Sequence, residues 1–144
     1  MKYLILLSSL FLTACSSTPS SFNITETMNI IALAEEHAPQ GIKGVFKFKI
    51  KASGVVRGKV YLNTELDYRD RRSISVSIAP QLVPEFVQQY GEAPDSFFIN
   101  KKIEVTGQAK RIKILFISNG RATEKYYYQT HVEINALEQI KLIG

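Results

Sequence analysis

The chain has 144 residues, enough for one ordinary domain, of which 45% are hydrophobic and 22% charged. These fractions are typical of folded soluble domains, and they exclude a disordered chain and a protein with several membrane spans. The formal net charge of +5 favours anionic partners without selecting one. Because Cys15 is the single cysteine, no intramolecular disulfide can form, and the hydrophobic core must hold the fold.

The first fifteen residues have the pattern of an export signal. Lys2 supplies a positive charge, and residues 3–12 (YLILLSSLFL) are mostly apolar. Ten residues are too few to cross about 30 Å of hydrocarbon, so this stretch is typical of a signal peptide. Residues 12–15 (LTAC) then resemble the lipobox of bacterial lipoproteins, where small residues precede a cysteine that is lipidated before cleavage. The alternative is an ordinary secretory signal followed by a chance cysteine.

The resemblance to bacterial lipoproteins implies that residues 1–14 are removed and that Cys15 carries diacylglycerol and a third acyl chain. Each buried methylene contributes roughly 0.8 kcal/mol, and a single chain binds only marginally, so several chains make a durable anchor. Ser16 stands where inner-membrane lipoproteins have aspartate, which implies the outer membrane, facing the periplasm. Residues 15–22 are then a lipidated flexible tether. The resemblance implies no activity.

Residues 23–144 are expected to form one globular domain that begins with a helix. Asn23 can cap this helix, and apolar residues recur at helical spacing over about residues 24–37 until Pro39 and Gly41 stop the pattern. From Lys43 the period changes to two, so that apolar residues at 46, 48 and 50 alternate with lysines. This alternation predicts a half-buried strand with one basic face.

Further strands are expected at residues 59–63 and 73–78, followed by a short helix within residues 80–91. Strands resume at Lys102, and a turn at residues 119–120 precedes the last long strand. The apolar set changes parity after Gly107, which predicts a bend or a bulge near residues 107–111. In the last strand, alternation predicts Tyr126 and Tyr128 inward and Tyr127 outward, and residues 139–143 can close an edge.

This order predicts a mainly β (α+β) fold. It has an N-terminal helix, and five strands with a short helix between the third and the fourth. Over residues 43–143 the layout resembles the OB-fold, a small Greek-key barrel. The resemblance depends on the order of elements and on no sequence motif. A generic α+β sandwich is the alternative.

Catalytic motifs are scarce in the sequence. The chain has no GxSxG, HExxH or CxxC pattern and no glycine-rich phosphate loop. Its two histidines, His37 and His131, are far apart in the chain and have no adjacent cysteine, whereas zinc sites need three or four ligands. We therefore expect no enzyme activity, no cofactor and no metal site.

Two surfaces are candidate ligand sites. Residues 65–72 hold three acids and three arginines, and arginine can grip carboxylate or phosphate with two parallel hydrogen bonds. The outer sheet face combines positive charge with rings suited to stacking. Alternatively, the loop charges only pair with one another, and the lysines only prevent aggregation. The candidate ligand-binding residues are Arg69, Arg71, Arg72, Lys47, Lys49, Tyr61 and Tyr127.

Taken together, the sequence predicts a membrane-anchored, noncatalytic binding module of the bacterial cell envelope. Its partner is expected to be an envelope protein, a glycan or another anionic ligand. One alternative is a structural or assembly accessory of an envelope complex, which needs an exposed protein interface. Another is an oligonucleotide-binding OB domain, although an exported protein meets little nucleic acid.

Overall fold

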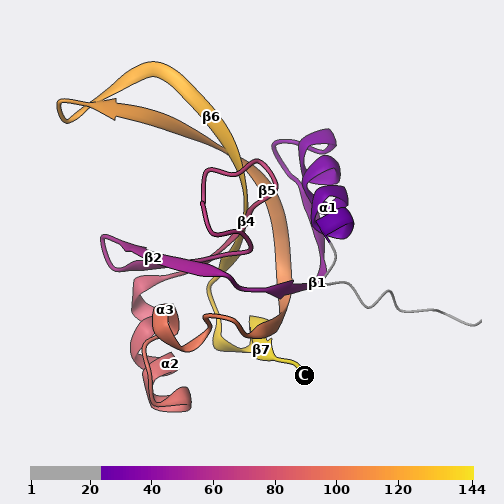
Figure 1. The fold of residues 1–144 in the computed structure, drawn as a ribbon, viewed down its shortest axis with the longest axis vertical. Coiled ribbons are helices and arrows are strands. Elements are labelled where there is room, and N and C mark those ends of the chain that lie inside the picture. Colours follow the sequence, from indigo (N-terminus) through magenta and orange to yellow (C-terminus); the bar gives the residue numbers. More distant parts are fainter. Residues whose placement is uncertain (1–23) are drawn as a thin grey trace, which may run out of the picture.

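A computed structural model of the chain describes residues 24–144 (Figure 1). The signal peptide, Cys15 and the tether lie outside the described residues. In chain order the helices and strands are α1 (Ile24–Glu36), β1 (Ile42–Lys49), β2 (Ala52–Val56), β3 (Lys59–Asn63), β4 (Ile74–Ile78), α2 (Val83–Tyr90), α3 (Pro94–Phe97), β5 (Lys102–Ser118), β6 (Arg121–Ile134) and β7 (Ile140–Leu142), with 3₁₀ turns at Pro80–Leu82 and Leu137–Gln139. Within the described part, no helix is long and apolar enough to cross a membrane.

The seven strands form one sheet in the order β1-β5-β6-β4-β3-β2, and β7 pairs with β5. The β4–β6 pair is parallel, and the other pairs are antiparallel. The two ends of this order, β1 and β2, are separated by only Ile50 and Lys51. The Ile50 N–H donates to the Lys101 carbonyl (3.0 Å), whereas the Lys51 N–H donates to the Asn63 carbonyl (2.9 Å). One bent stretch of chain, residues 42–56, therefore links both ends of the sheet order.

The core lies on the face of the sheet where the apolar residues of each strand alternate inward. Helix α1 buries Ile30, Ile31 and Ala34 and contacts β5. At the other end, α2 and α3 contribute a cluster of stacked and edge-to-face rings (Figure 1). The buried strand residues are Phe46, Phe48, Val60, Leu62, Ile74, Val76, Ile78, Ile103, Val105, Ala109, Val132, Ile134 and Ile140.

The predicted class, mainly β with helices, is confirmed, as are the first helix and the short helix that ends at Gly91. Gly91 has φ 79°, and its N–H donates to the Val87 carbonyl (2.8 Å), the C-terminal cap that glycine favours. The predicted number of five strands is wrong. The chain continues past Lys51 as β2, a Gly-containing strand without clear alternation, and residues 140–142 form β7.

The pairing shows no bulge within residues 107–111, where the sequence predicts a bend or a bulge. β5 pairs without interruption with β1 as far as Ala109, and the register shift lies between Leu115 and Ile117. Gly107 has a different role, because a Cβ atom there would lie 2.9 Å from Val132 Cγ1. Glycine at this position therefore lets β5 and β6 approach closely beside the core.

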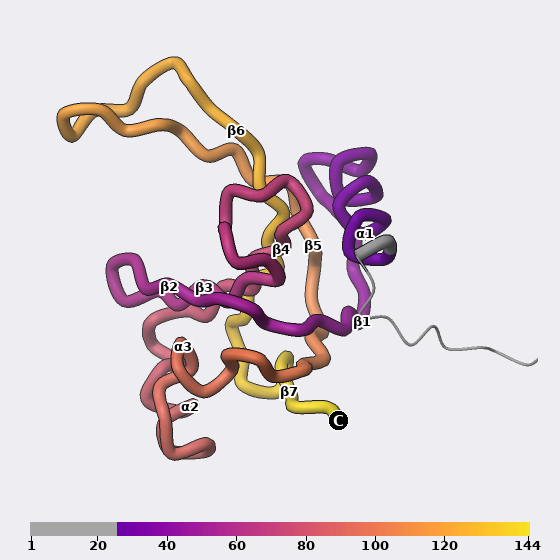
Figure 2. Tube along the Cα trace, in the orientation of Figure 1, coloured from indigo at the N-terminus to yellow at the C-terminus, as the bar shows by residue number. Residues whose placement is uncertain are grey.

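The apolar pattern changes parity because the β5–β6 hairpin leaves the body of the protein. Figures 1 and 2 show this hairpin projecting away from the other strands. Tyr126 and Tyr128 share the parity of the buried Val132, but they are 50% and 41% exposed. The prediction that these two tyrosines lie in the core is therefore wrong, since no other element among the described residues buries them.

Candidate ligand-binding groove

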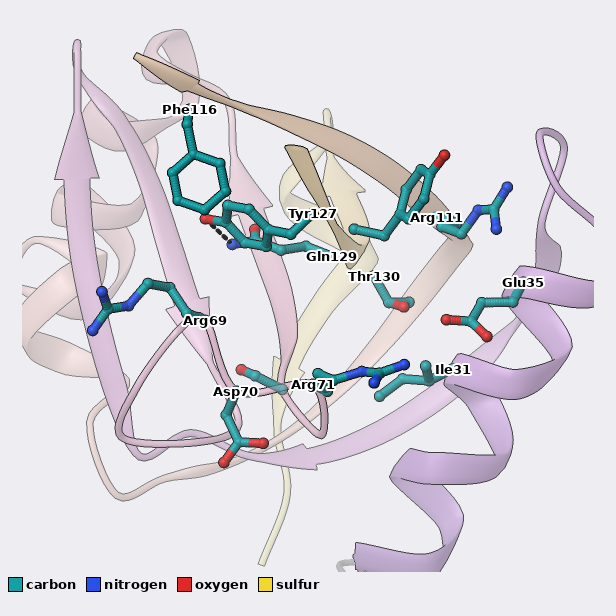
Figure 3. Close-up of a pocket in the computed structure, with 12 residues that line it drawn as sticks. Ile31, Glu35, Arg69, Asp70, Arg71, Arg111, Phe116, Tyr127, Gln129 and Thr130 are labelled. Carbon is teal, nitrogen blue, oxygen red and sulfur yellow. Dashed lines mark hydrogen bonds between the residues drawn. The ribbon is translucent and has the colours of Figure 1, made fainter. Parts of the chain in front are cut away.

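A groove of about 490 Å³ lies where three segments meet: α1, the loop of residues 64–73, and the base of the β5–β6 hairpin (Figure 3). β4 pairs with β6 only from the Ile74–Thr130 pair onward. Before Ile74 the loop separates from β6, and the space between them is the groove. Its walls carry both charged groups and rings.

The loop repeats one arrangement twice, Asp-x-Arg followed by Asp-x-Arg. Asp67 Oδ1 accepts the backbone N–H of Arg69 (2.9 Å), and the carboxylate accepts both Nε and Nη2 of that arginine (3.1 Å each). Asp70 holds Arg72 in the same way, at 2.9, 3.0 and 2.7 Å. These hydrogen bonds lower the pKa of the Asp67 carboxyl and lower the pKa of Asp70 to about 2. Arg69 and Arg72 are thus already paired with loop carboxylates.

Arg71 lies between these pairs and is different. Its side chain extends from the loop toward α1, ending near Ile31 (Figure 3). Within the described residues, Arg71 has no hydrogen bond and no ion pair. Of the three arginines predicted in this loop, Arg71 is the one whose guanidinium donors remain available to a ligand in the groove.

The hairpin supplies the opposite wall. The Arg111 guanidinium carbon lies 4.2 Å from the Tyr128 ring centroid, a cation–π contact. Tyr127 packs on Phe116 with ring centroids 5.2 Å apart, and Gln129 Nε2 donates to the Tyr127 hydroxyl (3.1 Å). Burial raises the pKa of this hydroxyl. The sequence predicted Tyr127 as a ligand residue of the outer sheet face and not of this wall, and it missed Arg111 and Tyr128, which adjoin each other only through the strand register.

The floor of the groove contains a buried hydroxyl group. Ser73 is only 5% exposed, and its Oγ has no hydrogen-bond partner among the described residues. A buried hydroxyl without a partner costs about 1–3 kcal/mol. Guanidinium, hydroxyl and ring faces together suit an anionic group carried on a flat or apolar body, and Glu35 at the α1 side adds one carboxylate.

The other predicted residues lie elsewhere. Lys47 and Lys49 line a second, smaller pocket of about 200 Å³ together with Lys51, which forms an ion pair with Glu65 at 2.8 Å. Thus the structure brings Arg69, Arg71 and Tyr127 together in the groove and separates them from the two lysines.

Tyr61 lies on the outer sheet face and lines neither pocket. Its ring contacts His131 at a centroid distance of 5.9 Å, and Lys59 lies beside both residues. Burial, and secondly the charge of Lys59, lowers the pKa of His131 to about 4. His131 is therefore neutral near pH 7. Among residues 24–144, no group of three potential ligands is placed to hold a metal ion.

The chain matches no family model and no curated protein. Among solved structures, 13 chains match. One of these is an aspartyl tRNA synthetase from Entamoeba histolytica, with 16% identity and a TM-score of 0.43 over 99% of this chain. The matched region spans 28% of the synthetase, so this chain corresponds to well under half of that protein's length. A likeness at this level carries no argument about function.

Proposed function

We propose that the protein is a membrane-anchored, noncatalytic binding module of the bacterial cell envelope, held by lipid on Cys15 at the outer membrane. Its groove binds an anionic ligand that also presents a flat or apolar surface. The observation that carries this proposal is the combination of an available arginine, Arg71, with the unpartnered buried hydroxyl of Ser73 in one hollow.

We also propose that the domain is an OB-like barrel. Three features support this: the helices between β4 and β5, the parallel β4–β6 pair, and the bent stretch of residues 42–56. If β1 and β2 are counted as one bent strand and β7 as an addition, five strands follow in Greek-key order. OB-folds bind ligands with one strand face and with the loops after their first and fourth strands, and the loop after the fourth strand corresponds here to the turn of the β5–β6 hairpin.

The charges of the groove favour an anion. Asp67 and Asp70 are neutralised by their own arginine partners, so they do not repel a negative ligand. Of the described carboxylates that line the groove with Arg71 and Arg111, Glu35 alone has no ion pair. Arginine forms paired hydrogen bonds to phosphate or carboxylate oxygens, and the Phe116 and Tyr127 rings can cover an apolar part of the same molecule.

Titration calorimetry on the full-length protein tests this proposal with three probes: inorganic pyrophosphate, a muramyl peptide that carries carboxylates, and a short single-stranded oligonucleotide. We expect Arg71→Gln to weaken binding of the recognised probe at least about tenfold, because charged hydrogen bonds contribute about 1.5–3 kcal/mol. Arg57→Gln, an equal change of charge outside the groove, is the matched control.

Two outcomes contradict the proposal: no probe binds, or the Arg71→Gln and Arg57→Gln variants bind alike. Binding of the oligonucleotide alone, with an affinity that falls steeply as salt rises, would instead favour the nucleic-acid alternative. In the envelope, a photo-reactive amino acid in place of Tyr127 would identify the natural ligand by crosslinking.

A further inference from the structure

The β5–β6 hairpin between residues 110 and 130 is a two-stranded ribbon. β5 pairs with β1 only as far as Ala109, and β6 pairs with β4 only from Thr130 onward. Between these points, within the described chain, the two strands pair only with each other. Figure 2 shows the ribbon projecting from the body. Because an isolated two-stranded hairpin is marginally stable, the core does not explain why the chain contains this one.

The ribbon carries the entire net charge of the described chain. Residues 110–130 contain five basic side chains and one acidic side chain, a net charge of +4. The remaining described residues contain twelve basic and twelve acidic side chains, a net charge of zero. The positive charge is therefore local, and it points to an anionic partner for the ribbon rather than to solubility of the whole domain.

The same ribbon exposes apolar side chains that a water-facing hairpin does not need. Leu115, Phe116 and Ile117 are 44%, 48% and 65% exposed, and Tyr126 is 50% exposed. Lys113 Nζ lies 4.2 Å from the Tyr126 ring centroid, so cationic and aromatic groups alternate along one face. Aliphatic chains, amphipathic rings and basic groups on one element are the composition that binds the interface of a lipid bilayer.

We propose that the β5–β6 ribbon docks on the surface of an anionic lipid bilayer. Its basic side chains contact lipid phosphates, and Leu115 and Ile117, which lie on the strand face opposite Phe116, enter the boundary between headgroups and acyl chains. The contact is shallow, since both edges of the ribbon have backbone groups that need water or headgroups as partners. A second copy of the chain is a poorer occupant, because two ribbons of charge +4 repel each other.

This docking is separate from the lipid on Cys15 and from the ligand of the groove. A lipid anchor on a tether holds the domain near a membrane without fixing its orientation. A second contact through the ribbon fixes which side of the domain faces the bilayer. The proposal therefore predicts a difference in lipid contact within one anchored molecule. The ribbon contacts the acyl chains, whereas the opposite end, where α2 lies, stays in water (Figure 1).

Tryptophan fluorescence measures that difference directly, because the chain contains no tryptophan. We would place full-length Ile117→Trp protein in vesicles of equal parts phosphatidylglycerol and phosphatidylcholine, and quench with brominated acyl chains. We expect a blue-shifted emission and loss of most of its intensity. Val87→Trp, an exposed apolar position on α2, is the matched control and should remain unquenched.

Charge is tested in the Ile117→Trp background. Each basic residue near an anionic surface contributes roughly a fivefold increase in affinity. Replacing three basic ribbon residues by glutamine should therefore abolish the quenching. Vesicles of phosphatidylcholine alone, which have no net charge, should abolish it too. The same number of substitutions away from the ribbon should have no effect. The ribbon set is Lys113→Gln, Arg121→Gln and Lys125→Gln, and the control set is Lys43→Gln, Lys49→Gln and Arg57→Gln.

Three results overturn the proposal. Unchanged emission at position 117 means that the ribbon stays in water. Equal quenching at positions 117 and 87 means that the anchor alone brings the domain to the lipid. Unchanged emission in vesicles, together with capture of one protein in cells by a photo-reactive group at position 117, means that the ribbon binds a protein instead. None of these results bears on Arg71 and the groove, so the two proposals fail separately.

Discussion

Ser73, just before β4, and Ser75, within β4, are two buried serines that should respond oppositely to replacement by alanine. Both are at most 5% exposed. The Ser75 hydroxyl donates to Asn63 Oδ1 (2.7 Å), whereas Ser73 Oγ has no partner among residues 24–144. The two substitutions remove the same atom from similar surroundings. A difference between the two variants in the free energy of unfolding therefore measures the hydrogen bond and not the packing.

For Ser75→Ala we expect a loss of about 2 kcal/mol in the free energy of unfolding, because the hydrogen bond is lost and the buried Asn63 oxygen is left unpaired. For Ser73→Ala we expect a gain of about 1 kcal/mol, since an unpartnered hydroxyl is removed from the interior. The difference of about 3 kcal/mol is a large part of the 5–15 kcal/mol by which domains are usually stable.

Urea unfolding followed by circular dichroism measures both values, with the slope against denaturant as a check that the unfolded state is unchanged. If Ser73→Ala loses as much stability as Ser75→Ala, the prediction is wrong, because Ser73 Oγ must then have a hydrogen-bond partner in the free protein. If the hydroxyl serves the groove, the Ser73→Ala variant should also bind the recognised probe more weakly while being more stable, a trade-off known for binding sites.

Three further predictions concern other parts of the chain. The pKa of His131 is lowered to about 4, so the unfolded state, with a pKa of 6.5, binds the proton first as pH falls. His131 should therefore leave the free energy of unfolding unchanged above pH 6.5 and lower it by about 3 kcal/mol near pH 4. In urea unfolding at pH 7 and pH 4, His131→Gln should remove this difference between the two pH values. A variant with the same pH dependence as the natural protein would contradict the prediction. Tyr127→Ala should lower the free energy of unfolding by about 2 kcal/mol and Tyr128→Ala by less than about 1 kcal/mol, because Tyr127 is covered by Phe116 while Tyr128 is exposed. A lower melting temperature for Tyr128→Ala than for Tyr127→Ala would mean that Tyr128 lies in the core, as alternation predicts. Cys15→Ser should abolish labelling by a fatty-acid analogue and release the protein from membranes, and persistent labelling would exclude the lipoprotein proposal.

Local periodicity was enough to place most of the secondary structure. The helix over residues 24–37 and the strands at 59–63 and 73–78 follow from apolar spacing, because each of these elements lies against the core along most of its length. Periodicity gave the wrong burial for Tyr126 and Tyr128 because alternation states only which residues share a face. Whether that face is covered depends on where β1 and β4 stop pairing, and this is fixed by distant parts of the chain.

The candidate site was predictable only in part, for a similar reason. The charged loop was recognised from composition, but the sequence does not show that Asp67 and Asp70 each hold the arginine two residues later and leave Arg71 available. Arg111 and Ser73 are 38 positions apart and meet because β6 lies between β4 and β5. No local pattern carries that information, whereas the strand order does.

The central position of β6 has a consequence for how the chain folds. β6 is the strand that pairs with both β5 and β4, so only the bend at residues 50–51 connects the β4 and β5 sides of the described sheet until residues 121–134 are available. The parallel pairing of Ile74 with Thr130 joins residues 56 positions apart, and such distant pairing forms slowly. While it is being synthesised, the chain therefore lacks the strand that completes its core. A protein that must pass unfolded through an export channel, as the proposed signal peptide requires, is suited by a fold in which the decisive strand comes late.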